Sequence, residues 1–299
     1  MPAASGDGRP PEKIGLVAGW GRYPLVVAEA LVAQGYQVFC LGLHGHADPV
    51  LRDLCHDYCE VGLGKLGAAI RYFRRHGVTR ATMAGKLHKV LLFRRFAFWH
   101  HLPDWRFCRT FYPHWISGTQ DRKDDTLLNA VVAAFAEDGI RFVPATDFAP
   151  DLLVPPGDLS DRSPSASQWQ DIEFGWHLAK AMGRLDVGQT VAVKGRAVLA
   201  VEAVEGTDEC IRRAGQLCPQ GGFKVVKVAK PQQDMRFDVP AFGLGTLQTL
   251  AAAGAAVLAV EAGKTILVDE FAVAAFARQH RIIVTAVDPQ RFAAREAAA

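Results

Sequence analysis

The sequence predicts an α/β protein with two domains: a parallel sheet covered by helices in the N-terminal half, and mixed strands and helices in the C-terminal half. Short apolar runs alternate with segments of helical periodicity, which is the pattern of βαβ units. A Pro- and Ser-rich stretch interrupts this pattern near the middle of the chain. A chain of 299 residues with 49% hydrophobic content is long enough to bury two cores.

Most expected elements of the first half end at a glycine. An apolar strand over 14–18 ends at Gly19, and a helix over 24–34 shows helical spacing and stops at a glycine. A helix over 124–138 has carboxylates in its first turn, where the helix dipole favours them, and also stops at a glycine. The same reasoning predicts strands over 37–43, 80–84 and 140–143 and a helix over 66–76.

The composition changes over Ala149–Ser167, which contains four prolines and four serines. Such stretches are typical of domain boundaries. We therefore expect a polar, disordered tail over 1–12, an N-terminal domain over 13–162 and a C-terminal domain over 163–299. Partly antiparallel strands are expected in the second domain, over 190–193, 197–204, 223–229, 256–261 and 282–286, with helices over 169–182, 207–214 and 271–279.

Charge and composition exclude several classes of protein. A formal net charge of +3 lacks the basic excess of a nucleic-acid binder, so no nucleic-acid partner is expected. The six cysteines have no second pair at zinc-ligand spacing, which favours free and mostly buried thiols. The start of the chain lacks the apolar segment of a signal peptide, and the longest apolar run, 250–260, is too short to span a bilayer. We expect a cytoplasmic protein, with contact to a membrane surface left open.

Two glycine-containing segments indicate a phosphate site at the carboxyl ends of the N-terminal strands. GLVAGWGRYP, Gly15–Pro24, places Gly19 and Gly21 between a strand and a helix start, where backbone N–H groups bind anions. Pro24 replaces the third glycine of the dinucleotide fingerprint, and no acid follows at the end of the second strand, so NAD is disfavoured. Gly85 and Lys86 of AGKLHK end the third strand at the same edge. A structural turn and a solvated lysine are the alternatives.

A basic and aromatic segment, Lys86–Trp115, contains nine of the chain's 28 aromatic residues. Its composition suits stacked single-stranded nucleic acid or an interfacial segment on anionic lipid. It also suits a partly buried subdomain with a basic rim. The sequence leaves all three open.

Acidic residues gather in GRAVLAVEAVEGTDE, Gly195–Glu209. Glu202 lies inside an apolar run, where a carboxylate is costly unless it is paired or bound to a cation. Glu205, Thr207 and Asp208 follow, and oxygen ligands of this kind bind Mg²⁺. Alternatively, Thr207 caps the next helix with Asp208 beside it.

KPQQDMRFDVP, Lys230–Pro240, holds two carboxylates four residues apart with an arginine between them. Its two prolines make a helix across this segment unfavourable. In an extended chain Asp234, Arg236 and Asp238 point to one side, either as an exposed charge ladder or as a reaction site. A carboxylate there activates water or binds metal, and an arginine binds phosphate.

Together these segments resemble the LpxI family of UDP-2,3-diacylglucosamine pyrophosphatases. The motifs that carry the resemblance are the Gly15–Pro24, Asp124–Leu128, Arg184–Gln189, Val198–Asp208, Lys230–Gly243 and Glu261–Gly263 segments, followed by Asp269. They span residues 14 to about 288, although Arg94–Trp115 aligns with none of them.

The resemblance implies a Rossmann-like N-terminal domain, a C-terminal catalytic domain and a substrate held between them. It implies Mg²⁺-dependent hydrolysis of the pyrophosphate bond of UDP-2,3-diacylglucosamine to UMP and 2,3-diacylglucosamine 1-phosphate (lipid X), in lipid A biosynthesis of Gram-negative bacteria. A homodimer, with possible contact to the inner-membrane surface, is expected.

The resemblance also implies residue roles. Asp238 is the family's essential aspartate, as metal ligand or general base, and Arg236 and Asp234 complete the catalytic group. Asp208 and Glu205 are the expected metal ligands beside Asp238. Expected substrate contacts are Gly19, Gly21, Gly85, Lys86, Glu202, Gly206, Thr207 and Lys230. The alternative function is a non-catalytic nucleotide-sugar or lipid-binding protein of the same fold.

Overall fold

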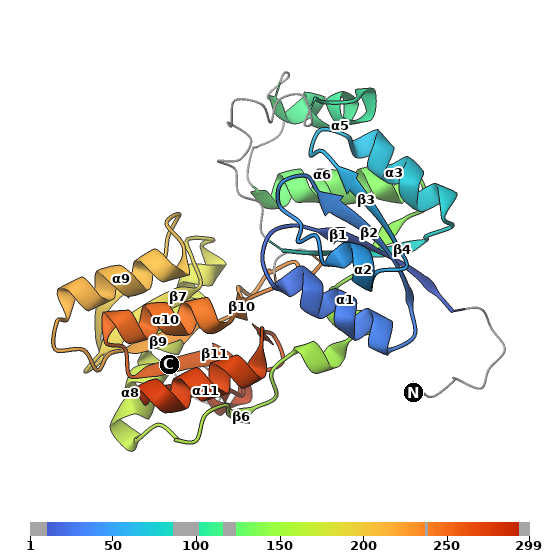
Figure 1. The fold of residues 1–299 in the computed structure, drawn as a ribbon. Helices are drawn as coiled ribbons and strands as arrows, with labels where there is room; N and C mark the ends of the chain where they lie inside the picture. Colours follow the sequence, from blue (N-terminus) through green and yellow to red (C-terminus); the bar gives the residue numbers. More distant parts are fainter. Residues whose placement is uncertain (1–10, 86–101, 116–123, 237–238, 293–299) are drawn as a thin grey trace. The chain divides into compact units, whose positions relative to one another are not determined.

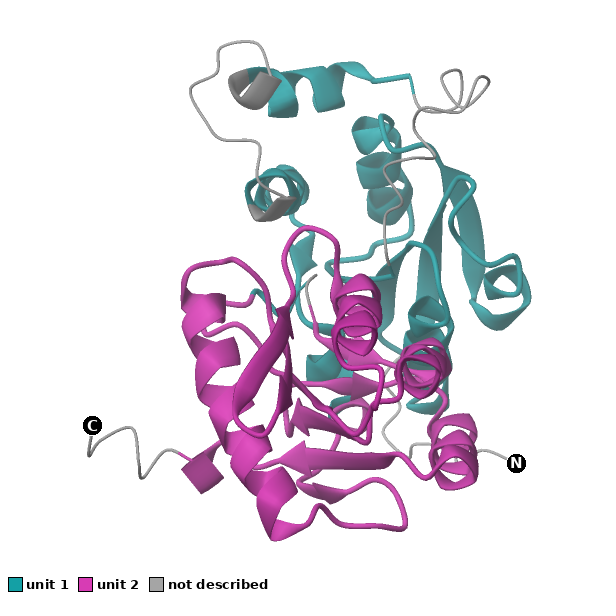
Figure 2. Cartoon of the chain, turned by 90° about the vertical axis from the view of Figure 1, so that its left-hand side faces the viewer, with its two compact units in different colours: residues 1–150, 234–237 teal, residues 151–233, 238–299 magenta. Residues whose placement is uncertain are grey.

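The structure, a computed structural model, describes residues 11–85, 102–115, 124–236 and 239–292 (Figure 1). Among the sequence expectations, most of the N-terminal tail, Lys86, part of the basic aromatic segment and Asp238 lie outside these residues. The chain divides into two units (Figure 2), of which unit 1 contains residues 1–150 and 234–237 and unit 2 contains 151–233 and 238–299. The boundary expected after residue 162 falls within unit 2.

Unit 1 is built on a parallel five-stranded sheet of order β3-β2-β1-β4-β5. This is the Rossmann-like arrangement, in which the strand order reverses beside the first strand. The parallel sheet is therefore confirmed. The pattern missed one strand, Asp57–Val61, because its sequence DYCEV lacks an apolar run. The strands are β1 (Lys13–Ala18), β2 (Gln37–Leu43), β3 (Asp57–Val61), β4 (Arg80–Ala84) and β5 (Arg141–Phe142).

Helices cover this sheet because each has an apolar face. Helix α1 (Tyr23–Ala33) packs on β1, β2 and β4, and the short α2 (Leu51–Leu54) packs on β2 and β3. A separate buried cluster joins the sheet to α3 (Leu66–Arg75) and α6 (Asp124–Ala136), with Phe73 fully buried. Two short elements, α7 (Ala145–Phe148) and η2 (Pro150–Leu152), follow β5.

The described part of the basic aromatic segment forms α5 (Trp105–Trp115), which packs on α3 and α6. Asp104 accepts hydrogen bonds from the backbone N–H of Ala68 (3.1 Å) and Phe107 (2.9 Å), so it links the starts of α3 and α5. Arg106 bonds to Asp138 at 2.9 Å, beyond the end of α6. Arg106 thus ties the described part of this segment to the residues that follow α6. Among the helices that the structure describes, none has the length and apolar character needed to cross a bilayer.

Unit 2 contains a mixed six-stranded sheet of order β6-β13-β11-β9-β7-β8, in which β6, β7 and β8 run antiparallel to their neighbours. The expected mixed arrangement is confirmed. Helix α10, Leu244–Ala253, and the two-stranded sheet of β10 and β12 were not expected from the sequence. The strands are β6 (Gly157–Asp158), β7 (Thr190–Lys194), β8 (Ala197–Val201), β9 (Lys224–Lys227), β10 (Ala241–Phe242), β11 (Val257–Glu261), β12 (Ile266–Leu267) and β13 (Ile283–Val287).

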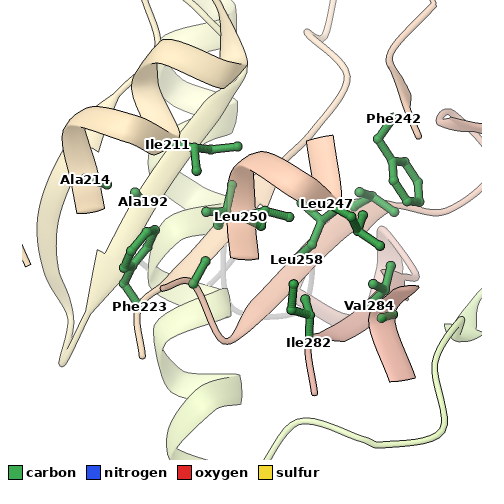
Figure 3. Packing of buried hydrophobic residues seen from close by; sticks show 14 of the residues in the cluster. Ala192, Ile211, Ala214, Phe223, Phe242, Leu247, Leu250, Leu258, Ile282 and Val284 are labelled. Atoms are coloured by element: carbon green, nitrogen blue, oxygen red, sulfur yellow. The ribbon is translucent and has the colours of Figure 1, made fainter. Parts of the chain in front are cut away.

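Alternating residues of the central strands build two cores, one on each face of the unit 2 sheet. Val257 and Ala259 of β11 pack with α8 (Ala166–Arg184), whereas Leu258 and Val260 pack with the opposite helices. Strand geometry requires this alternation. The second core, drawn in Figure 3, includes residues of α9 (Thr207–Leu217), α10 and α11 (Glu270–His280).

The six cysteines are free, as expected. Four of them, Cys40, Cys55, Cys210 and Cys218, are buried, and Cys108 is exposed. The four buried cysteines fill apolar positions in the two units, which is the ordinary role of a buried free thiol.

A buried carboxylate ties α8 to the β7–β8 hairpin. Asp171 is only 3% exposed. Its carboxylate accepts hydrogen bonds from the N–H groups of Gly195 (3.0 Å) and Arg196 (2.6 Å). It also forms an ion pair with Lys224, at 2.9 Å. Both turn residues have positive φ, as a tight two-residue hairpin turn requires. Burial by itself raises the pKa of Asp171. The bonds from Lys224 and the two N–H groups lower this pKa by more than burial raises it, so the net shift is downward.

Replacing this carboxylate should weaken unit 2. We expect Asp171→Asn to lower the free energy of unfolding by about 3–5 kcal/mol, because Lys224 then keeps a buried charge without its partner. The folded-state pKa of Asp171 lies below the unfolded value of about 3.9, so the contribution is present above that pH and is lost as the pH falls through the folded-state pKa. Urea unfolding from pH 7 to pH 3 measures both effects.

Glu209→Gln is the matched control. Glu209 forms an exposed ion pair with Arg212 one helical turn away, so its loss should cost under about 1 kcal/mol. Equal losses in the two variants would contradict the anchoring role of Asp171.

Candidate functional site

The carboxyl ends of β1 and β4 meet at the point where the unit 1 strand order reverses. Gly19 donates its N–H to the carbonyl of Ala84 at 2.8 Å, which brings the two following loops together. At Gly85, where φ is +98°, a Cβ atom would lie 2.8 Å from the Gly19 carbonyl carbon and 2.8 Å from Pro24 Cγ. Only glycine satisfies both the backbone conformation and this close approach.

This junction places three of the expected substrate contacts at one edge. Gly19 and Gly21 precede α1, and Pro24 lies in its first turn, where a missing N–H costs nothing. Ligands of open α/β sheets bind at such a reversal point, and helix N-termini attract anions. The junction can therefore accept a phosphate group against its backbone. Lys86, expected beside it, lies outside the described residues.

In unit 2, Glu202 follows β8 and is buried, with 8% of its surface exposed. Its Oε1 accepts a hydrogen bond from Thr207 Oγ1 at 3.0 Å, and its backbone N–H bonds to the carbonyl of Thr190 at 2.8 Å. Oε2 is buried without a hydrogen bond to any described residue. Gly188 makes this packing possible, because a Cβ there would lie 2.1 Å from the Glu202 carbonyl oxygen.

The start of α9 corrects one sequence interpretation. Gly206, with φ of +84°, is the N-cap, and Thr207 is the first helical residue. Thr207 is therefore not the cap. Its hydroxyl bonds to Glu202 instead, so the side chain that the sequence left unexplained is stabilised by Thr207 at the positive end of the helix dipole.

The described residues include two of the three expected metal ligands. Glu205 forms an ion pair with Arg213 at 2.6 Å, and Asp208 lies in the first turn of α9. Within residues 11–85, 102–115, 124–236 and 239–292, no three His, Cys, Asp or Glu side chains gather as a metal site requires. Asp238, the remaining member of the expected set, is outside these residues. The described carboxylates alone therefore do not fit a complete Mg²⁺ site.

Lys230 is held by contacts within unit 2. Its ammonium group lies 2.7 Å from Asp186 Oδ1, and its backbone N–H bonds to Gln233 Oε1 at 2.8 Å. Asp186, which belongs to the segment Arg184–Gln189, has a positive φ of 56°. Two separate sequence motifs thus meet at Lys230.

Glu261 is a residue of this region that the motif reasoning did not assign. It is fully buried at the end of β11, and its Oε2 accepts bonds from Lys180 Nζ (2.5 Å) and from the N–H of Ala229 (2.7 Å). Lys180 also donates to the Ala229 carbonyl at 3.0 Å. This pair therefore fixes the backbone just before Lys230. A glutamate ending an apolar run was the available sequence signal.

Asp234 and Arg236 belong to unit 1 and bind each other. Arg236 Nε lies 2.8 Å from Asp234 Oδ1, its Nη2 also donates to Asp234, and Nη2 lies 2.7 Å from Asn129 Oδ1 on α6. Arg236 is in a turn, so the expectation of an extended chain is wrong at this residue. The turn forms because Asp234 also accepts the Arg236 backbone N–H, at 3.1 Å.

The hydrogen bonds from Arg236 lower the pKa of Asp234 below its usual value, although burial opposes them. The same contact raises the pKa of Arg236. Asp234 is therefore ionised at neutral pH and is a weak base. This arrangement lets Asp234 orient the guanidinium rather than exchange protons.

Comparisons with known proteins cover almost the whole chain. A family model of the LpxI N-terminal domain matches residues 13–152, and one of the LpxI C-terminal domain matches residues 155–285. A protein of Caulobacter vibrioides named UDP-2,3-diacylglucosamine pyrophosphatase LpxI is 33% identical over 285 residues, which cover 93% of this chain and 98% of that protein. The solved structure of CobK precorrin-6A reductase has a TM-score of 0.30 and 12% identity, covering 93% of this chain and 88% of that one.

The glycine junction can be tested by substitution. Gly85→Ala should destabilise unit 1 by more than the roughly 1–2 kcal/mol that a left-handed alanine costs, because its Cβ would also meet the Gly19 backbone. Gly77→Ala is the matched control, since Gly77 has φ of +71° and open space around it. Urea unfolding of both variants measures the difference. Equal losses in the free energy of unfolding would mean that the close approach at Gly85 does not affect stability.

Proposed function

Because the chain belongs to the LpxI family, as its motifs indicate, we propose that it hydrolyses the pyrophosphate bond of UDP-2,3-diacylglucosamine. The products are UMP and 2,3-diacylglucosamine 1-phosphate (lipid X), a step of lipid A biosynthesis. The observation that carries this proposal is that the family relationship extends through both units, including every motif at which a site residue was expected.

The reaction requires positive groups around a diphosphate. The backbone N–H groups of the Gly19–Gly21 loop would contact phosphate oxygens on unit 1, and Lys230 and Arg236 would neutralise further charge. The contacts of Asp234 and Asn129 with Arg236 support this role, because they hold the planar guanidinium in one orientation before substrate binds. We propose that both units contribute groups to substrate binding.

Water is the nucleophile in the proposed reaction. Its oxygen bonds to one phosphorus, the bridging P–O bond breaks, and the bond electrons leave with the other phosphate. Asp238 takes the proton from water in this scheme, as general base. Attack at either phosphorus yields the same two products, so turnover in ¹⁸O-water followed by mass spectrometry of UMP identifies the phosphorus attacked.

We further propose that Mg²⁺ assists the reaction, with Asp208 and Glu205 as candidate ligands and Asp238 as a ligand in the alternative in which it is not the general base. A bound cation would screen the diphosphate charge and polarise a phosphoryl oxygen. Removal of the metal by EDTA should abolish turnover, and added Mg²⁺ should restore it. Full activity in EDTA would exclude this cofactor.

Exposed apolar side chains beside Lys230 support a lipid substrate. Leu185 and Val187, 77% and 47% exposed, flank the Asp186 that binds Lys230. Contact with an acyl chain would remove this apolar surface from water. Leu185→Ser should raise KM for the diacyl substrate, with little effect on an analogue lacking the chains. Leu217→Ser, at another exposed position in unit 2, is the control.

The central test is Asp238→Ala. We expect loss of UMP release of at least 1,000-fold, a range typical of removing an essential catalytic group, with substrate binding and thermal unfolding unchanged. Arg236→Lys should retain the charge but lose the planar fork, and should lower kcat/KM at least tenfold. Absence of UMP release by the wild-type protein with any divalent cation would favour the non-catalytic binding protein instead.

A further inference from the structure

Two cysteines of unit 1 lie together between β2 and the short helix α2. Cys40 is in the middle of β2, and Cys55 is the C-cap residue of α2. Cys40 is fully buried, and Cys55 is 8% exposed. The two thiols are within hydrogen-bonding reach of each other. The packing of α2 on the sheet brings them together, because they are distant in the sequence.

Strand alternation places Cys40 on the face of the sheet that α2 covers. Its neighbours Phe39 and Leu41 pack with α3 and α6 on the other face, and successive strand residues point to opposite faces. Cys40 pairs in the sheet with Tyr58 of β3. The centre of the Tyr58 ring lies 5.2 Å from Cζ of Arg52, which belongs to α2. The Cys40 side chain therefore points toward α2.

Backbone hydrogen bonds hold Cys55 beside β2. Its N–H donates to the carbonyl of Leu51 at 3.1 Å, and the N–H of the next residue, His56, donates to the carbonyl of Val38 at 2.9 Å. Val38 lies on the same face of β2 as Cys40. Neighbouring strands lie about 4.8 Å apart, within the roughly 4.4–6.8 Å between Cα atoms that a disulfide spans. The backbone at this point therefore has the spacing that a disulfide requires.

The two thiols differ in acidity. The hydrogen bond from Cys40 lowers the pKa of Cys55, although burial opposes this shift. The same hydrogen bond, together with burial, raises the pKa of Cys40. Cys55 is therefore the thiol that ionises first, and the thiolate is the form that reacts with oxidants. Cys55 is also the more exposed of the two, so a small oxidant reaches it first.

Cys59 of β3 is close in sequence but does not belong to this pair. Its side chain packs with the cluster of α3 and α6, on the opposite face of the sheet. Cys59 is more exposed than Cys55, so exposure alone would select it as the reactive thiol. Burial and the carboxylates of Asp57 and Glu60 raise the pKa of Cys59. The geometry of the sheet thus selects Cys55.

We propose that Cys40 and Cys55 form an oxidation site, at which hydrogen peroxide converts the two thiols to a disulfide. The Cys55 thiolate attacks one peroxide oxygen, the O–O bond breaks, and hydroxide leaves with the proton of the Cys55 thiol as water. Cys55 is then a sulfenic acid. The Cys40 sulfur attacks the Cys55 sulfur, the S–O bond breaks, and the hydroxyl group leaves with the Cys40 proton as a second water. Two electrons pass from the thiols to the peroxide, and a thiol reductant reverses the reaction.

The disulfide would close a loop that contains α2 and the residues that follow β2. Because α2 has only four residues, it has little stability of its own. A crosslink over a loop of this length favours the folded state on the order of 100-fold in the folding equilibrium constant. The alternative is a pair of buried thiols that only fill apolar space and do not react.

The test is crosslink mapping on the full chain. The protein is treated with hydrogen peroxide, the remaining thiols are blocked with N-ethylmaleimide, and tryptic peptides are analysed by mass spectrometry. Cleavage after Arg52 separates Cys40 from Cys55, so the disulfide joins two peptides. We expect this crosslinked pair in the wild-type protein, together with a higher urea midpoint that dithiothreitol returns to its starting value. Wild-type protein in which both thiols are still blocked by N-ethylmaleimide after unfolding overturns the proposal, whether or not the variants fold.

Variants identify the partners. Cys40→Ser and Cys55→Ser should each lose the crosslink and the rise in urea midpoint, and unfolding of the untreated variants checks that they fold. Cys59→Ser is the matched control, because residue 59 lies in the same tryptic peptide as Cys55 but faces the other side of the sheet. It should keep both effects. A crosslink that disappears in Cys59→Ser and persists in Cys55→Ser overturns the assignment. Neither readout depends on UMP release, so the site and the proposed function are tested separately.

Discussion

The close approach of the backbone at Gly19 and Gly85 is the constraint on which the unit 1 site depends. A hydrogen bond from Gly19 to Ala84 joins the ends of β1 and β4, and no side chain fits between the loops that follow. Backbone N–H groups rather than side chains are therefore available at the point where the strand order reverses. This arrangement suits an anion, and Pro24 is accommodated in place of a third glycine because proline fits the first turn of α1.

Unit 2 depends on buried carboxylates that are paired in different ways. Asp171 uses two backbone N–H groups and Lys224, Glu202 uses Thr207, and Glu261 uses Lys180 and the N–H of Ala229. These contacts join α8 to the β7–β8 turn and β9, the end of β8 to the start of α9, and the end of β11 to α8 and to the segment after β9. Because an unpaired buried charge is strongly unfavourable, these contacts hold α8, α9 and the strand ends in one arrangement. Glu261 and Asp186 together fix the position of Lys230.

The segment from Lys230 to Arg236 contains residues of both units. Lys230 is anchored to unit 2, whereas Asp234 and Arg236 belong to unit 1 and form their own ion pair. That pair places the arginine in a defined orientation and leaves Asp234 ionised. A carboxylate so engaged is suited to positioning, which is consistent with assigning proton transfer to a different aspartate in the proposed mechanism.

The sequence by itself determined the α/β class, the mixed sheet of the second half and the family, because apolar periodicity, glycine stops and long motifs are local patterns. It also placed Gly19, Gly21 and Gly85 at one edge, since parallel strands end on the same side. It missed β3 and α10, whose patterns are weak, and it could not identify partners distant in the chain. Glu60 with His44, Glu261 with Lys180 and Arg236 with Asn129 meet only after the strands have paired and the helices have packed. Tertiary structure alone decided these contacts, because charge pairing depends on distance in space and not on spacing in sequence.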